Sequence, residues 1–234
     1  RRHGDSKDPS VWSALTASFT LIMVTELGDK TFFIAAILAM RNSRLAIYSG
    51  AMLALVVMTL LAVGAGNLAP LLIPKVYTHY AAAALFLFFG VRLLKDGWGM
   101  HPDHVSDELE ETEAELGEES EELEPLAGGE RRRAGGSGRG TCGLPAAFVQ
   151  SFTLTFLAEW GDRSQIATLA LAASKDAVGV TVGSIFGHSI CTGLAVVGGR
   201  MLASRISERT VHLVGGIVFL AFAVAAVLMG PEDL

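Results

Sequence analysis

The chain contains a long internal repeat, and this repeat constrains the fold more than any other feature of the sequence. A shift of 133 positions, the distance from Ser18 to Ser151, aligns residues 18–97 with residues 151–230 without a gap. Such a repeat predicts two halves of equivalent architecture. Identical residues recur along the whole alignment: Ser18 to Leu21 with Ser151 to Leu154, Gly50 with Gly183, Thr59 with Thr192, Gly66 with Gly199, His79 with His212, and Phe86 with Phe219.

Each half is apolar enough to lie in a membrane. Hydrophobic residues make up 51% of the 234 residues, and the mean hydropathy is +0.45. These values are typical of integral membrane proteins. The sequence therefore predicts an all-α polytopic membrane protein with six transmembrane helices. The windows long enough for the roughly 20 residues that span a bilayer are 12–38, 46–72, 78–97, 145–172, 178–202 and 210–229.

Three spans in each half is an odd number, so the second half enters the membrane from the side opposite to the first. We therefore predict two inverted three-helix repeats. In transporters of this design, the substrate site lies near the middle of the membrane, where equivalent helices of the two halves meet. Here those helices are the first and the fourth.

The predicted domain division follows the repeat. Twelve of the 24 acidic residues lie within 103–124, and a glycine-rich stretch follows at 128–138. This central segment has no clear function in the sequence, and the two cysteines, Cys142 and Cys191, indicate no disulfide framework. The expected parts are an N-terminal tail (1–10), the first repeat (11–97), an acidic and glycine-rich loop (98–143), the second repeat (144–230) and a C-terminal tail (231–234).

Basic residues are distributed unequally between the two sides of the predicted membrane. Cytosolic loops carry an excess of Lys and Arg. We therefore expect the central loop to be cytosolic and both termini to lie on the other side. The side with the central loop holds Arg41, Arg44, Arg92, Lys95, Arg131, Arg132, Arg133, Arg139, Arg200, Arg205 and Arg209, and the other side holds Arg1, Arg2, Lys7, Lys75 and Lys175.

A charged motif occurs once in each half, inside an apolar window: residues 26–31 read ELGDKT and residues 159–164 read EWGDRS. Each ionisable group in hydrocarbon costs roughly 2.5–3.5 kcal/mol on insertion scales, so such groups usually line an ion or proton path. On a continuous helix the two acids of a motif share one face. We expect the four acids to form one cation site: Glu26, Asp29, Glu159 and Asp162.

The other motif residues narrow the cation. The motifs offer carboxylates, hydroxyls and an amide but no thiol or imidazole, and all-oxygen sites suit Ca²⁺, Mn²⁺ or Mg²⁺ better than Zn²⁺ or Cu⁺. Gly28 and Gly161 allow either a local unwinding of the helix or close helix packing. The basic residues either pair with the acids of the empty site or anchor a helix. The supporting residues are Thr25, Lys30, Thr31, Arg163, Ser164 and Gln165.

Outside the motifs, His188 lies deep in the fifth window, where it either relays protons or makes a hydrogen bond that fixes helix packing. Gly183 and Gly187, with Gly50 and Ala54 in the equivalent helix, predict close helix packing. Crowded carboxylates attract protons as well as cations, so a divalent ion and protons would compete for the same oxygens. Such competition, at a site open alternately to each face, produces exchange.

The two Glu-x-Gly-Asp-(Lys/Arg)-(Ser/Thr) motifs resemble the signature of the Golgi-type cation/proton exchanger family, and both halves are similar to its animal Golgi branch at residues 26–37 and 154–165. The resemblance implies an antiporter in the Golgi membrane that moves cytosolic Mn²⁺ and Ca²⁺ into the lumen in exchange for protons and so supports glycosylation. It also implies that both motifs form the cation site. Combined with the orientation expected from the basic residues, a Golgi location would place the termini in the lumen. The expected partners are these ions and the lipid bilayer, with no cofactor and no nucleic acid; whether the chain forms a homo-oligomer stays open.

Two other functions are compatible with parts of the pattern. Intramembrane aspartyl proteases also place Gly-Asp in a transmembrane helix, but here the motif is duplicated and is followed by Lys30 or Arg163. A passive divalent-cation channel also selects its ions with acidic side chains. The sequence alone does not separate a channel from an exchanger, because the difference lies in proton coupling.

Overall fold

The structure is a computed structural model that describes residues 9–100, 111, 112, 114, 116, 144–203 and 207–230. The predicted tails, apart from Pro9 and Ser10, and most of the central loop lie outside the described residues. The described residues form no strand, so the all-α class is confirmed. Their helices are α1 (Pro9–Glu26), α2 (Lys30–Arg41), α3 (Arg44–Leu72), α4 (Lys75–Gly99), α6 (Leu144–Glu159), α7 (Arg163–Ser174), α8 (Ala177–Ala203) and α9 (Glu208–Met229).

Four of the described helices, α3, α4, α8 and α9, are long and apolar enough to cross a membrane, and α1 adds a shorter apolar helix over Val11–Glu26. The prediction of a polytopic membrane protein is confirmed. Proline marks the boundary between α3 and α4: Ile73, which precedes Pro74, is extended (φ −129°, ψ 133°). A residue before proline is disfavoured in the helical region, so the chain turns there.

The first and fourth predicted spans differ from the prediction. Residues 12–38 form two helices, α1 and α2, and residues 145–172 also form two, α6 and α7. The prediction that the two acids of each motif lie on one continuous helical face is wrong, because each motif contains a helix break. Each of these spans is therefore a pair of shorter helices that meet at a motif.

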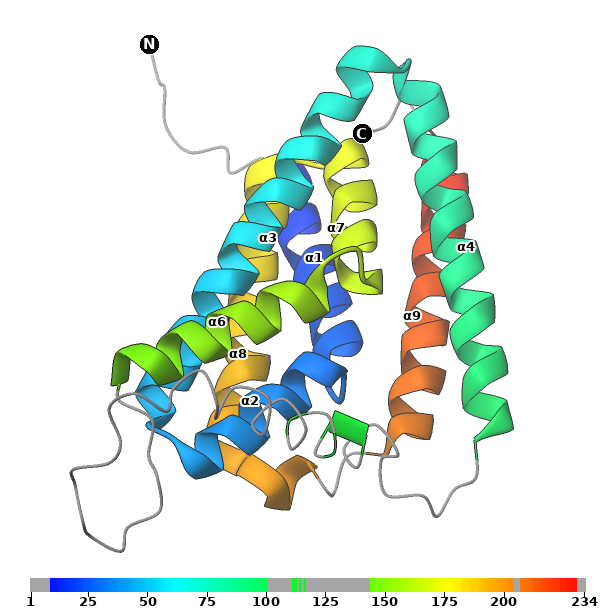
Figure 1. Cartoon of the computed structure of the whole chain (residues 1–234). Helices are drawn as coiled ribbons and strands as arrows, with labels where there is room; N and C mark the ends of the chain where they lie inside the picture. The colour runs from blue at the N-terminus through cyan, green and yellow to red at the C-terminus, as the bar shows by residue number, and fades with distance from the viewer. Residues whose placement is uncertain are drawn as a thin grey trace, which may run out of the picture.

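The two long helices α3 and α8 hold the broken helices in place. α8 packs on α1 and α2, and α3 packs on α6 and α7. Figure 1 shows that α3 and α8 run in opposite directions, as do α4 and α9. Each motif therefore lies in a pair of helices that packs on one of these two long helices.

Glycines allow these helices to approach closely. A Cβ added at Gly183 of α8 would collide with the Leu15 carbonyl of α1, and one added at Gly50 of α3 would collide with the Phe148 carbonyl of α6. Small residues at such contacts allow helix backbones to pack without a side chain between them. The predicted close packing at Gly50 and Gly183 is confirmed, and it occurs at equivalent positions of the two halves.

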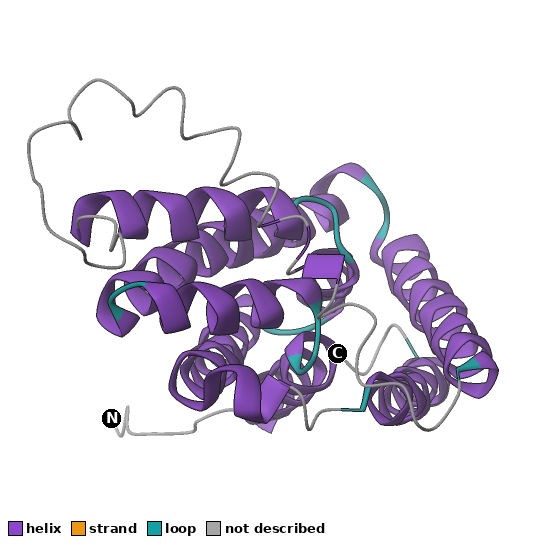
Figure 2. Ribbon diagram, turned by 60° about the horizontal axis from the view of Figure 1, so that its bottom comes forward, coloured by secondary structure: helices purple, strands orange, loops and turns teal. Residues whose placement is uncertain are grey.

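The helices α4 and α9 form a pair beside the other six described helices (Figure 2). Aromatic rings fill their interface: the ring centroids of Phe219 and Phe89 are 5.7 Å apart, and those of Phe219 and Phe86 are 6.1 Å apart. Such offset contacts stabilise a pair beyond the area that it buries. This pair contributes no residue to the motifs, which lie among the other helices.

Candidate cation site

The helix break has the same geometry in both motifs. Gly28 (φ +82°) and Gly161 (φ +80°) are left-handed, a conformation that glycine adopts without steric cost. The following aspartates are extended and occupy the N-cap positions of α2 and α7. The Asp29 N–H donates to the Glu26 carbonyl (3.3 Å), and the Asp162 N–H donates to the Glu159 carbonyl (3.2 Å). Each glutamate therefore ends one helix and each aspartate begins the next.

Of the two roles predicted for the glycines, local unwinding is the one observed. A Cβ added at Gly161 would meet no atom within 4 Å, so close packing does not explain this glycine. The left-handed turn ends α6 at Glu159 and lets α7 start at a new angle. The ends of two helices thus meet at the acids, an arrangement that transporters use to place helix termini at an ion site.

Glu26 and Glu159 are buried, with exposed fractions of 3% and 2%. Thr31 donates from its hydroxyl to Glu26 Oε2 (3.3 Å), and Ser164 donates to Glu159 Oε2 (3.2 Å). The other carboxylate oxygen, Oε1, is buried without a hydrogen-bond partner in both residues. An unpaired buried carboxylate oxygen is unfavourable. The site therefore presents two oxygens that a cation or a proton can occupy.

Asp162 completes a group of three acids. Its carboxylate accepts from the backbone N–H groups of Gln165 (2.8 Å) and Ser164 (3.1 Å), so it caps α7. Glu26, Glu159 and Asp162 each offer one oxygen, and these atoms lie within 4.8 Å of one another. Two ligands of one Ca²⁺ ion, each at about 2.3–2.6 Å, lie at most about 5 Å apart. One divalent cation can therefore contact all three residues.

Asp29, the fourth predicted acid, has a different partner. Arg163 donates from its Nη2 to Asp29 Oδ1 (2.6 Å), in an ion pair whose side chains are 33% and 15% exposed. The pair joins the two halves, because Arg163 belongs to the second motif and Asp29 to the first. The structure thus brings three of the four predicted acids together and pairs the fourth with a basic residue.

The remaining supporting residues lie around the break. Gln165 accepts from the Gly161 N–H through its side-chain oxygen (2.6 Å), which closes the turn. Lys30 is the first residue of α2 and is half-buried. Thr25 donates to the Leu21 carbonyl of its own helix (3.0 Å) rather than to a carboxylate. Of the predicted hydroxyls, those of Thr31 and Ser164 contact the acids.

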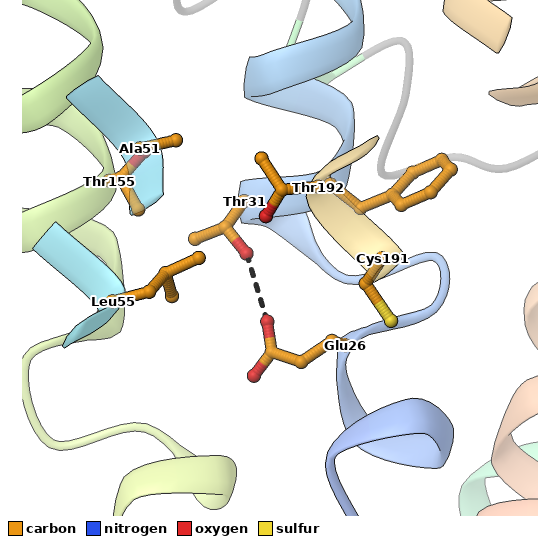
Figure 3. A pocket seen from close by; sticks show the side chains of 8 residues that line it. Glu26, Thr31, Ala51, Leu55, Thr155, Cys191 and Thr192 are labelled. Atoms are coloured by element: carbon orange, nitrogen blue, oxygen red, sulfur yellow. Dashed lines mark hydrogen bonds between the residues drawn. The ribbon is translucent and has the colours of Figure 1, made fainter. Parts of the chain in front are cut away.

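A small cavity of about 10 Å³ lies beside Glu26, at the lower limit of the roughly 10–15 Å³ that a single water molecule needs. Figure 3 shows side chains from α3, α6 and α8 around it. Sequence reasoning did not assign the polar residues Thr155, Cys191 and Thr192 to the site. Two of them carried a signal: Thr155 lies one helical turn before Glu159, and Thr192 is an identity of the repeat.

The helix α8 brings nitrogen and sulfur near the carboxylates. His188 is buried, and its Nδ1 has no hydrogen-bond partner and lies 3.9 Å from Glu26 Oε1. The Cys191 thiol lines the small cavity and donates to the Met23 sulfur (3.6 Å). The motif residues alone predicted a site made only of oxygen atoms. The structure adds a nitrogen atom and a sulfur atom near the acids.

Comparison with known proteins gives a family match for this chain. A family model described as the divalent cation/proton antiporter GDT1 matches residues 14–101 and 147–233, which contain both motifs. The chain belongs to the GDT1 family. No solved structure matches the chain.

Three relatives that match the chain come from a plant and a cyanobacterium. GDT1-like protein 3 of Arabidopsis thaliana is 49% identical over 97% of this chain and 74% of its own length. A GDT1-like protein of Synechocystis is 45% identical over 92% of this chain and 96% of its own length. The Arabidopsis protein named PAM71-homolog, chloroplastic, is 44% identical over 91% of this chain and 58% of its own length.

Family membership decides between some of the functions that the sequence left open. The GDT1 family consists of cation/proton antiporters, so this chain is a transporter rather than an enzyme, and the protease alternative is dropped. The transported ions are substrates, and no cofactor is indicated. Placement in the Golgi branch stays a prediction, because the relatives reported above are from plants and a cyanobacterium.

Proposed function

We propose that this GDT1-family protein exchanges Mn²⁺ and Ca²⁺ for protons by alternating access at a single site. The ligands are the carboxylates of Glu26, Glu159 and Asp162, and Asp29 completes the four-acid set in another state of the cycle. Thr31 and Ser164 orient the glutamates through the hydrogen bonds described above.

One observation carries the proposal: three carboxylates from two helix breaks lie within 4.8 Å of one another, in a place where both glutamates are almost fully buried. Taking several charges out of water together costs several kcal/mol for each ion unless opposite charges or protons neutralise them. The site therefore holds either a cation or protons when it is closed to water. Replacement of one by the other at the same oxygens is the chemical basis of exchange.

The proposed alternation rests on two inverted three-helix repeats. The family model matches once in each half. The packing of α8 on α1 and α2 corresponds to that of α3 on α6 and α7. If the two halves are equivalent, each half can adopt the conformation of the other. This conformational change would open the site to the opposite face of the membrane.

For the membrane, we propose the Golgi, with the central loop in the cytosol, the termini in the lumen and cations moving into the lumen to support glycosylation. The motif resemblance and the distribution of basic residues support this placement. One relative that matches the chain has chloroplastic in its name. Microscopy of a tagged chain decides between the organelles. Protection of tags at either terminus from added protease in sealed membranes decides between the two orientations.

The transport activity is tested by uptake of Mn²⁺ and Ca²⁺ into proteoliposomes that hold the full chain, with an acidic interior or with equal pH on both sides. We expect uptake against the cation gradient when the interior is acidic. Glu26→Gln and Glu159→Gln should abolish it, because each removes one charged ligand while keeping the side-chain volume.

A matched control is Asp96→Asn, which removes an acidic charge outside the site. Asp96 lies on α4 in an exposed pair with Arg92 (3.8 Å), so its loss should leave uptake unchanged. Flux that runs only down the cation gradient, whatever the pH difference, would show a passive channel and refute the proposed exchange.

A further inference from the structure

His188 is a buried polar residue near the site that the proposed exchange does not use. Its side chain lies on α8, and only 5% of the residue is exposed. Its Nδ1 and Glu26 Oε1 face each other at 3.9 Å, and neither atom has a hydrogen-bond partner. A buried polar atom without a hydrogen-bond partner is unfavourable. Two such atoms, just beyond hydrogen-bonding distance of each other, are arranged to share a third species.

The separation fits a shared cation. Two atoms that bind one ion at about 2.3–2.6 Å lie at most about 5 Å apart, and 3.9 Å is within this limit. The same Glu26 contributes an oxygen to the three-acid group, whose atoms lie within 4.8 Å of one another. His188 is not a member of that group, so a cation that contacts the imidazole would use Glu26 as the ligand shared with the three-acid site.

The imidazole occurs in one half only. The repeat aligns His188 with Leu55, and Leu55 lines the small cavity beside Glu26. A leucine is thus sufficient for packing at the equivalent position of the first half. The second half adds a nitrogen donor there, and its Nδ1 makes none of the hydrogen bonds that a packing role would require.

We infer that His188 Nδ1 is a ligand of the transported cation and favours Mn²⁺ over Ca²⁺. This inference rests on the proposed function. Ca²⁺ takes oxygen ligands, whereas divalent transition-metal ions also accept imidazole nitrogen. The ligand form is the neutral imidazole with its proton on Nε2, which leaves the Nδ1 lone pair free. A single nitrogen among carboxylates lets Ca²⁺ bind but gives Mn²⁺ the additional bond.

The first test detects the metal–nitrogen bond directly. Mn²⁺ is bound to the purified full chain in detergent, and pulsed electron paramagnetic resonance measures whether a nitrogen nucleus is coupled to the ion. We expect a nitrogen coupling typical of imidazole, which should disappear in His188→Gln. Absence of this coupling in the unchanged protein, with Mn²⁺ bound, overturns the inference.

The second test measures selectivity. In proteoliposomes, we measure the KM for Ca²⁺ divided by the KM for Mn²⁺. This ratio should fall at least about tenfold in His188→Gln and in His188→Leu, where leucine is the residue at the equivalent position of the first half. The expected size follows because loss of even an outer-shell partner of a metal ligand lowers metal affinity about 10–100-fold. Val197→Ala, an exposed position on the same helix, is the control. A variant that slows both ions equally, with an unchanged ratio, overturns the inference and indicates a proton relay or a packing role. Loss of proton-driven uptake by the unchanged protein would instead refute the proposed function.

Discussion

Gly161 provides a direct test of the helix break. Its φ of +80° lies in the left-handed region, and an added Cβ would meet no atom within 4 Å. Replacement by alanine therefore adds backbone strain without a collision. For an L-residue that strain is about 1–2 kcal/mol. For a chain of this length, 1 kcal/mol corresponds to roughly 2–4 °C in Tm, so Gly161→Ala should lower the Tm in detergent by about 2–8 °C.

The matched control is Gly64→Ala in α3. A Cβ there also meets no atom within 4 Å, but Gly64 is helical, so alanine should stabilise the helix by up to about 1 kcal/mol. Gly161→Asn should cost less than Gly161→Ala, because asparagine tolerates the left-handed region better. Thermal unfolding followed by circular dichroism measures all three. A Tm for Gly161→Ala that equals or exceeds that of the unchanged chain would refute the helix break as described.

Three further predictions concern charges. Asp162→Ala removes the cap of α7 and should destabilise the protein by about 1 kcal/mol, whereas Asp162→Asn keeps a capping oxygen and should lose exchange with little change in Tm. Melting and uptake assays on both variants separate these effects. Normal exchange by Asp162→Asn would contradict the ligand role. Arg163→Gln removes the basic partner of the Asp29 carboxylate and should lower the Tm. The double variant with Asp29→Asn should recover part of this loss. A double variant with no recovery would show that loss of the ion pair does not cause the lower Tm. Lys175 lies in the turn between α7 and α8, and its burial lowers the pKa of its ammonium group. The unfolded chain therefore binds the Lys175 proton more tightly than the folded chain does. The stability of the fold should then rise with pH until the lysine of the unfolded chain also loses its proton. Melting curves across the alkaline range should show a smaller rise for Lys175→Gln, and an identical rise would contradict this assignment.

The apolar windows predicted the long helices because a span of about 20 apolar residues has few other stable conformations in a membrane. They did not predict the break at Gly28, since a glycine inside an apolar run is compatible with a continuous helix. The break depends on the left-handed turn and on the N-cap position of Asp29, and both are local features whose energies nearly balance those of a helix. The composition of the window therefore could not decide between the two.

The contacts between the halves were harder to predict than the elements themselves. Arg163 lies beside Asp162 in the sequence but pairs with Asp29 of the other motif, a contact set only by how the broken helices meet. The position of His188 deep in an apolar helix was visible in the sequence, but the face that it presents was not. That face depends on the packing of α8 against α1, which places the imidazole next to Glu26.

The charge of the site also limits how the exchange can run. Glu26, Glu159 and Asp162 lie within reach of one ion, while the charge of Asp29 is paired with Arg163. Because uncompensated charge is costly where water is excluded, the loaded and exchanged forms of the site should carry the same net charge. Two protons carry the same charge as one divalent cation, so we expect electroneutral exchange. Uptake by proteoliposomes with the membrane potential clamped at different values by a potassium ionophore should then be constant at a fixed pH gradient. Uptake that changes steeply with potential would mean that the net charge changes during the cycle and that a further group titrates or moves with the cation.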